Sequence, residues 1–457
     1  MTEQEKLNSK TLACYAGISM PIAAMIMPVA VYMPPFYSET LGLDLATVGL
    51  IFTLARIWDV VTDPLMGLAI DRFDTRWGRR KHWIAIGVPI MMLAIWMVFV
   101  PNPETVSGLY LGFWLMVMYL GYTMMTIAHQ SWGAELALSY DDRSRLCSWR
   151  EILLLMGMVI VLATPALIEI VWEVTDQGIK VASMGYLCIL MLPISAYFAL
   201  RYVPDRAVRT NMTVNWSEAL KLLVTNTVMW RILIADFATG FATSATGALY
   251  IFLMTYVFEL PQLASFMLLI IFLAGSLAMP FWLKLATRFG KDLTIILSLV
   301  ICVAMHLYLF FVAAPGNTVG IWVYTVAYGI VFGAPPTLLR SMMADITDVD
   351  ELQTGSKRAG LFYALMGTTS KFGSSLAVGV TFVFIQLVYG FQPGPDNNQA
   401  AIDGLLITYV VCGVVSFALA AVMFIRYPLS KQKHEEVRNL LAAKSQTPVA
   451  DAASETS

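Results

Sequence analysis

The chain has 457 residues, of which 58% are hydrophobic and 13% are charged, and its mean hydropathy is +0.70. Soluble domains carry about 25% charged residues, so this composition excludes an ordinary soluble domain and indicates many membrane spans. The formal net charge is −2 and the basic residues lie in short loops, so no nucleic-acid partner is expected. The five cysteines are scattered and odd in number, which indicates neither a disulfide framework nor a metal site.

Twelve long apolar runs follow one another along the chain. They lie at 12–37, 45–70, 83–101, 108–136, 148–172, 183–202, 228–257, 262–286, 293–313, 318–343, 360–389 and 404–426. Only helices or closed barrels cross lipid, and these runs are too long for barrel strands. The sequence therefore predicts an all-α polytopic membrane protein with twelve transmembrane helices.

The longest internal polar stretch, 201–226, separates six spans from six. A weak repeat supports two halves, because PLMGLAIDRF and PFWLKLATRF each close the second span of a half. Two such bundles around a midplane site are the usual layout of a secondary transporter. We expect the following division: a cytoplasmic N-terminus 1–11, a six-helix bundle 12–202, a linker 203–227, a second bundle 228–426, and a partly disordered cytoplasmic tail 427–457.

Basic residues mark one side of the membrane. The loops after spans 2, 4, 6, 8 and 10 carry them, for example Arg143, Arg206, Arg288 and Lys357, whereas Lys180 is the exception on the other side. Cytoplasmic loops carry an excess of Lys and Arg. Both termini are therefore expected in the cytoplasm, with the chain in the cell inner membrane.

The second span carries three charges on one helical face. Arg56, Asp59 and Asp63 are spaced by three and four residues. Each bare charge at the bilayer centre costs about 2.5–3.5 kcal/mol, so these residues need an internal surface and partners. Two carboxylates one turn apart predict a cation site for Na⁺ or H⁺, in which Asp59 and Asp63 would be the Na⁺ ligands. The alternative is a structural ion pair with Arg56. No other cofactor is expected.

Lys371 lies about 11 residues into span 11, in GTTSKFGSS. A lysine at that depth needs an anion. The strong anions at similar depth are Asp59 and Asp63, so the sequence predicts an ion pair between the two bundles. The alternative is a lysine that extends to the membrane interface.

Lys371 and four further residues are candidate substrate ligands. His129 and Trp132 lie in span 4, where a histidine could hydrogen-bond a solute and an indole could stack on a sugar ring. Arg150, with Glu151, opens span 5, and Arg56 of span 2 joins the set. The alternatives are a packed neutral histidine and an interfacial Arg150–Glu151 pair. Outside this set, Asp236 is read as facing a loop and His306 as a packing residue.

Two loops are candidate gates. Asp71 at the end of span 2 is followed by Arg79 and Arg80, and Lys357 and Arg358 lie in the acidic loop between spans 10 and 11. Ion pairs in such loops can form in one conformation and break in another, and we expect Asp71 to pair with Arg79 and Arg80 when the site faces outward. The alternative for the second loop is ordinary solvation.

Several of these segments resemble a known family. RIWDVVTDPLMG, DRFDTRWGRRKHW, ADITDVDELQTGSKRAGLFYA and SKFG are similar to the glycoside–pentoside–hexuronide:cation symporter family of the major facilitator superfamily, which includes melibiose permease. The resemblance runs from about residue 10 to 426. It implies the twelve-helix fold, a cation site at Asp59 and Asp63, and coupled uptake of a sugar, glycoside or hexuronide.

The substrate half of the pattern departs from melibiose permease. Span 1, GISMPIAAMIMPVAV, has no acidic residue, and His129 stands where that permease has an acid. Lys371 matches, whereas Arg150 matches only roughly. We therefore expect the substrate to be an acidic or acceptor-rich saccharide rather than a neutral galactoside. The chain is expected to be a monomer. A carrier of lysolipid or another amphiphile is the alternative. An enzyme is not indicated, because the sequence shows no metal cluster, nucleophile elbow or phosphate loop.

Overall fold

The computed structural model describes residues 7–73, 75, 78–136, 140–174, 176–204, 226–354, 359–394, 396–429 and 431–446. Within these residues, twelve helical segments are long and apolar enough to cross a membrane. The predicted fold class and the twelve spans are therefore confirmed. The linker 203–227 lies almost entirely outside the described residues, so its predicted role is not addressed.

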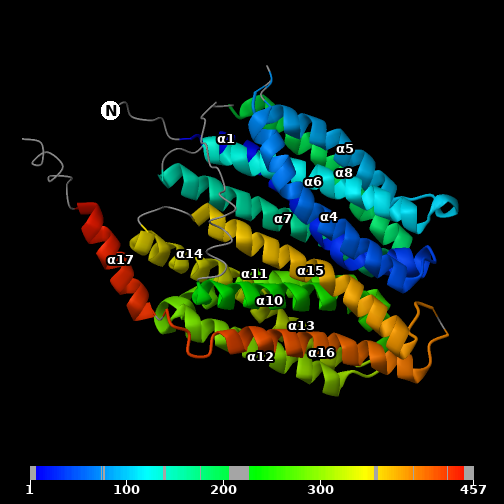
Figure 1. Cartoon of the computed structure of the whole chain (residues 1–457). Helices are drawn as coiled ribbons and strands as arrows, with labels where there is room; N and C mark the ends of the chain where they lie inside the picture. The colour runs from blue at the N-terminus through cyan, green and yellow to red at the C-terminus, as the bar shows by residue number, and fades with distance from the viewer. Residues whose placement is uncertain are drawn as a thin grey trace, which may run out of the picture.

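The N-terminal half supplies the first six spans, drawn in blue to green in Figure 1. Its helical elements are α1 (Ser9–Ala16), α2 (Ser19–Met27), η1 (Pro28–Tyr32), α3 (Met33–Pro35), η2 (Phe36–Thr40), α4 (Leu45–Arg72), α5 (Lys81–Phe99), η3 (Pro103–Thr105), α6 (Gly108–Leu136), α7 (Tyr140–Trp172) and α8 (Gln177–Tyr202). Side-chain caps begin three of these spans: Asn8 accepts from the Lys10 N–H, Asp44 from the Thr47 N–H, and Asp176 from the Ile179 N–H.

The C-terminal half forms a second bundle of six spans below the first in Figure 1. Its elements are α10 (Thr227–Phe252), η4 (Leu253–Val257), η5 (Pro261–Leu263), α11 (Ala264–Phe289), α12 (Lys291–Val312), α13 (Thr318–Phe332), α14 (Ala334–Thr354), α15 (Ala359–Tyr389), α16 (Gln399–Met423) and α17 (Lys431–Gln446). Helix α17 packs on α14, and His434 Nε2 lies 3.0 Å from Asp348 Oδ2. Helices α1 and α17 lie at the same end of the molecule, which we call the terminal end. The opposite end is the distal end.

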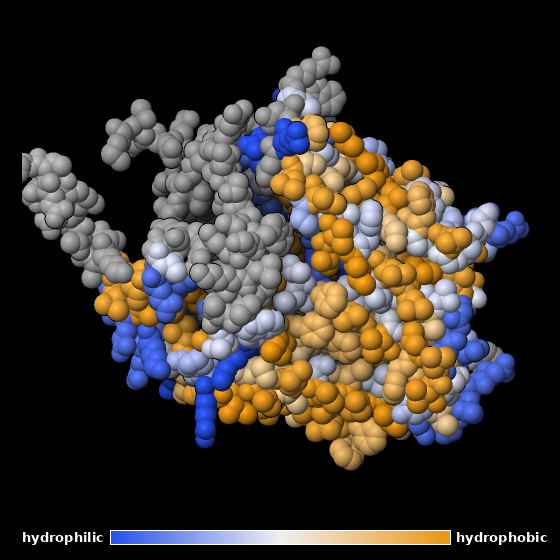
Figure 2. Space-filling model, in the orientation of Figure 1, coloured by the Kyte–Doolittle hydropathy of each residue, from blue (hydrophilic) through white to orange (hydrophobic). Residues whose placement is uncertain are grey.

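The surface between these two ends is apolar. Figure 2 shows hydrophobic side chains over the flanks of both bundles and hydrophilic side chains at the terminal and distal ends. Exposed Leu109, Phe311 and Leu387 are examples of these apolar flank residues. Large exposed apolar areas are rare on soluble proteins, and this arrangement suits a surrounding bilayer.

The first span is irregular. The π-helical elements η1 and η2 interrupt it around Pro28 and the Pro34–Pro35 pair. Proline lacks an N–H and disturbs the regular hydrogen-bond ladder, which favours such widened turns. The irregular part faces the second bundle, because η1 packs against α10.

Helices α4 and α15 hold the two bundles together at close range. A Cβ atom on Gly49 would lie 2.8 Å from the Phe382 Cβ, and one on Gly379 would lie 2.2 Å from Thr53 Oγ1. Small residues allow membrane helices to approach this closely. One turn further in, Thr53 Oγ1 donates to the Ser375 carbonyl at 2.9 Å.

The distal end carries further hydrogen bonds between the bundles. The Gln386 amide contacts Asp44, and Tyr256 donates to Glu39 at 2.9 Å. Glu169 of α7 accepts from the Ser265 hydroxyl at 2.7 Å. These contacts close the distal side of the interface between the halves.

Candidate functional site

Asp59 and Asp63 lie one turn apart on the buried face of α4. Thr123 of α6 stands between them, with its hydroxyl oxygen 2.7 Å from Asp59 Oδ1 and 3.0 Å from Asp63 Oδ1. A hydroxyl can donate only one proton, so Thr123 donates to one carboxylate at a time. Three side chains from two helices thus bring oxygen atoms together at one point. Oxygen atoms are the ligands that hard cations prefer.

Lys371 of α15 completes this cluster from the other bundle. Its Nζ lies 2.5 Å from Asp63 Oδ2 and 3.0 Å from Asp59 Oδ2. The Asp59 side chain is fully buried, whereas about a third of the Asp63 and Lys371 side chains is exposed, 33% and 29%. The predicted ion pair between the bundles is present, and it reaches both carboxylates.

Arg56 lies at the edge of the same cluster. Its Nη1 is 3.9 Å from Asp59 Oδ2, and its guanidinium carbon is 4.8 Å from the centre of the Tyr119 ring. This distance to Asp59 exceeds that of a good hydrogen bond, so the ion pair is loose. Arg56 also lines the cavity described next.

A cavity of about 280 Å³ lies between the two bundles beside the ionic cluster. The N-terminal half contributes Ile26, Met27, Ala30 and Val31, which are apolar, and Arg56. The C-terminal half contributes most of the hydroxyl groups, from Thr243, Ser244, Thr246, Tyr250, Tyr328, Ser370, Ser374 and Tyr409. Among the described residues that line it, none carries a carboxyl group.

His129 and Trp132 do not join this cavity. His129 Nε2 lies 2.9 Å from the Tyr15 carbonyl oxygen, and its ring stacks on Tyr15 at 4.1 Å between centroids. Trp132 is fully buried and donates to the Pro204 carbonyl at 3.1 Å. This geometry favours the packing alternative for both residues.

The geometry of α6 explains this placement. Successive helical residues are separated by about 100° around the axis. His129 is therefore about 120° away from Thr123, and Trp132 is on the opposite side of the helix. A helix that presents Thr123 to Asp59 and Asp63 directs the other two side chains elsewhere.

Arg150 forms the interfacial pair that was the alternative to a substrate clamp. Its Nη2 lies 2.8 Å from the Glu151 Oε1, and neither residue lines the cavity. His306, predicted to be a packing residue, is buried, with Nδ1 2.8 Å from the Cys302 carbonyl. Asp236 was expected to face a loop and is instead buried, 3.4 Å from the Thr369 hydroxyl.

The candidate gating arginines make contacts within the first bundle. Arg80 Nη2 lies 2.7 Å from Glu135 Oε1, and Arg79 Nη1 lies 3.6 Å from the same oxygen. The Asp71 side chain, like Lys357 and Arg358, lies outside what the structure describes. The pairing expected for Asp71 therefore stays a prediction.

Sequence reasoning missed Thr123 and the cluster around Lys180. The Lys180 Nζ lies 2.9 Å from Glu169 Oε1, and both side chains are fully buried. Glu169 was a visible signal, since it is an ionisable residue in an apolar run. Thr123 gave no comparable signal, because a hydroxyl in a span most often bonds its own helix.

The chain is similar to several known proteins. The family model described as MFS/sugar transport protein matches residues 14–431. The isoprimeverose transporter of Lactiplantibacillus pentosus is 25% identical over 416 residues, which cover 88% of this chain and 85% of that protein. The sodium-dependent lysophosphatidylcholine symporter 1 of Gallus gallus is 22% identical and covers 96% of this chain and 90% of its own length.

Solved structures show the same fold. The nucleoside transporter NupG superposes with a TM-score of 0.64 at 17% sequence identity, covering 91% of this chain and 98% of that chain. At this identity the likeness concerns the fold. It confirms the major facilitator arrangement of two six-helix bundles.

Proposed function

This chain belongs to the MFS/sugar transport protein family, and we propose that it couples the uptake of a sugar, glycoside or hexuronide to the entry of a cation, Na⁺ or H⁺. The family and fold are those of membrane transporters. The isoprimeverose transporter among its relatives supports a saccharide as the solute. The basic loops support cytoplasmic termini, and hence an inner-membrane carrier whose distal end faces outward.

The single observation that carries the coupling proposal is the contact of Lys371 with both Asp59 and Asp63. The ammonium group offsets one of the two negative charges and so reduces the repulsion between the two carboxylates. A bound Na⁺ or proton would supply the same charge and so compete with Lys371. Because Lys371 belongs to the second bundle, its release would loosen a tie between the halves.

The charges around the cavity favour an anionic solute. Asp59 and Asp63 are balanced by Lys371 and the loosely paired Arg56. Binding of a cation would leave one positive charge in excess, which an acidic sugar could neutralise. This supports Arg56 and Lys371 as substrate-facing residues, whereas His129, Trp132 and Arg150 lie elsewhere.

Alternating access follows from the contacts between the bundles. Rigid-body movement of the two halves exposes a central site to one side at a time. The structure has the distal side closed through Glu39, Glu169 and Asp44. We propose that these contacts open when the solute enters and re-form before it leaves at the terminal end.

A lysolipid or similar amphiphile is the second candidate solute. It is favoured by the apolar wall of Ile26, Met27, Ala30 and Val31 and by the Gallus gallus relative. A thermal-shift screen of the purified chain separates the two candidates. If the solute is a saccharide, saccharides or uronic acids should raise the melting temperature, because a ligand at 100 times its dissociation constant stabilises the folded chain by about 2.7 kcal/mol. This rise should require Na⁺ or a low pH, since the cation and the solute are proposed to bind together. Stabilisation by lysophosphatidylcholine alone would favour the second candidate.

A further inference from the structure

The cavity is elongated. Along α10 it is lined from Gly240 to Tyr250, which corresponds to about 15 Å of helix rise. A single sugar ring is shorter than this. The cavity therefore has room for a second group beyond the ring that occupies one end of it.

One end of the cavity is polar. Arg56 reaches it from α4, and Ser370 and Ser374 of α15 lie on either side of Lys371 in the chain. Gly240 and Thr243 begin the α10 wall at the same end. Sugar hydroxyls and a carboxylate would find donors and acceptors here, next to the cation site.

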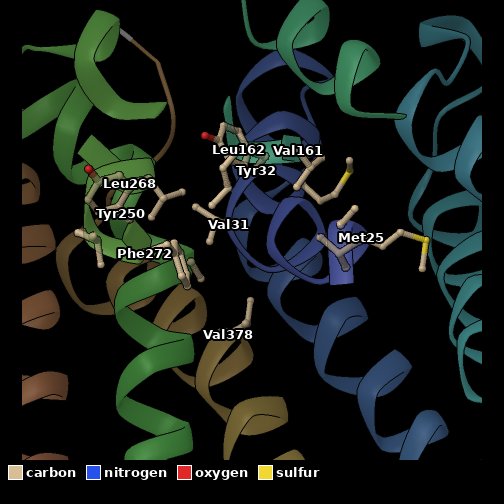
Figure 3. Packing of buried hydrophobic residues seen from close by; sticks show 14 of the residues in the cluster. Met25, Val31, Tyr32, Val161, Leu162, Tyr250, Leu268, Phe272 and Val378 are labelled. Atoms are coloured by element: carbon tan, nitrogen blue, oxygen red, sulfur yellow. The ribbon is translucent and has the colours of Figure 1, made fainter. Parts of the chain in front are cut away.

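The other end is apolar. Val31 comes from η1, Leu268 and Phe272 come from α11, and the Phe272 ring packs edge-on against Phe332 at 5.2 Å. Figure 3 shows Val31 of the first bundle opposite Leu268, Phe272 and Tyr250 of the second. These side chains, apart from Tyr250, have no polar atom.

The hydroxyl groups near this end are mostly engaged. Tyr250 donates to the Ala264 carbonyl at 3.3 Å, and the Tyr409 and Tyr324 hydroxyls pair at 3.0 Å. The Tyr328 hydroxyl is buried and has no hydrogen-bond partner among the described residues. A second sugar ring placed here would bury several hydroxyls with too few partners, which is unfavourable.

We propose that the apolar end binds the aglycone of a glycoside, so that the preferred solutes carry an aromatic or compact apolar group on a single sugar. This inference rests on the proposed saccharide transport and adds the chemical class of the solute. The sugar lies at the Arg56 end, and the aglycone packs among Val31, Leu268 and Phe272. The Tyr328 hydroxyl bonds to a polar atom at the junction. The volume of about 280 Å³ lies near the lower limit of about 300 Å³ for ligand pockets, which fits two small rings.

The test compares matched pairs of ligands. The purified full-length chain is titrated by calorimetry, with Na⁺ and at fixed pH, with glucose, galactose, xylose and glucuronate and with the phenyl glycoside of each. At least one phenyl glycoside should bind ten or more times tighter than its parent sugar, a difference of about 1.4 kcal/mol. Phe272→Ala should reduce that ratio to less than threefold while leaving the affinity for the parent sugar unchanged.

Two further variants separate this effect from misfolding. Val31→Thr keeps the side-chain shape, adds a hydroxyl, and should weaken binding of the phenyl glycoside alone. Phe281→Ala changes a phenylalanine of the same helix that is 56% exposed and does not line the cavity, and it should change neither affinity. Equal binding of parent sugars and phenyl glycosides, or a preference that survives Phe272→Ala and Val31→Thr, would overturn the inference alone. Failure of every saccharide to bind would contradict the proposed function itself.

Discussion

Lys180 and Lys371 each form ion pairs with carboxylates within the membrane-spanning region. The two clusters differ in which bundle supplies the positive charge and which supplies the negative charge. Lys180 and Glu169 both belong to the N-terminal half and are fully buried, and among the described residues the second bundle contributes a hydrogen-bond partner in the uncharged Ser265. Lys371 belongs to the C-terminal half, and its two carboxylates, Asp59 and Asp63, belong to the other half.

This difference has a mechanical consequence. When the distal end opens, Lys180 and Glu169 can move together, and this cluster loses its hydrogen bonds with the uncharged Ser265 while its ion pair stays intact. Separation at Lys371 instead breaks an ion pair and leaves two carboxylates together, unless a cation takes its place. The distal cluster is therefore suited to structural closure, and the cluster at mid-depth is suited to coupling.

The largest effect on stability is expected at the distal cluster. Lys180→Met leaves Glu169 as an unpaired buried charge, and breaking a buried pair in this way costs about 3–5 kcal/mol. The double variant Lys180→Met with Glu169→Gln removes both charges and should recover most of this loss. The free energy of unfolding in detergent measures both. If Lys180→Met were as stable as the wild-type chain, the Lys180–Glu169 ion pair would not contribute to the stability of the distal cluster.

A smaller loss is expected at mid-depth, because Lys371 is partly exposed. Lys371→Met should cost about 1–3 kcal/mol, between the values for surface and buried pairs. Added Na⁺ or a lower pH should recover this loss, since a cation or a shared proton replaces the missing charge. Added Na⁺ should not rescue Lys180→Met, which leaves a single carboxylate, whereas a lower pH should help both variants because protonation removes the buried charge of Glu169. An identical response of the two variants to Na⁺ would remove the distinction between the clusters.

The smallest effect is expected for the uncharged partner, Ser265. Ser265→Ala removes the hydroxyl bond to the Glu169 carboxylate but keeps the backbone N–H bond, and it should destabilise the distally closed form by about 1.5 kcal/mol, roughly a tenfold population shift. An impermeant thiol reagent added from the distal side should then label Leu268→Cys faster, in a chain whose native cysteines are replaced by serine. Ser276→Ala is the control, because that hydroxyl bonds within α11. Equal labelling rates in the two variants would argue against Ser265 as part of the closure.

The sequence predicted the cluster of Asp59, Asp63 and Lys371 because ionisable residues in apolar runs are rare and need partners. Arg56, Asp59 and Asp63 share a helical face, and Lys371 lies at a depth where few anions are available. The twelve spans and the two halves were predictable for a similar reason, since bilayer thickness fixes the length of apolar runs. These features depend on local sequence and on the cost of burying charge.

Features that depend on how the helices pack against one another were not predictable. Thr123 and Ser265 are ordinary hydroxyl residues until another helix brings a carboxylate to them. His129 and Trp132 were judged by residue type, although their position on α6 relative to Thr123 depends on how that helix is turned. The apolar end of the cavity arises from side chains of two halves, including Val31 in the irregular η1.

The most direct test of the coupling site is transport by Asp59→Asn and Asp63→Asn in proteoliposomes, with the saccharide that binds most tightly. The wild-type chain should accumulate the saccharide above equilibrium when a Na⁺ or H⁺ gradient is imposed. Each variant should lose this accumulation and retain exchange of labelled for unlabelled solute, because exchange does not require the empty carrier to return. Asp236→Asn, which changes a buried carboxyl outside the cluster, should still accumulate. Accumulation by Asp59→Asn or Asp63→Asn at the wild-type level would contradict the assignment.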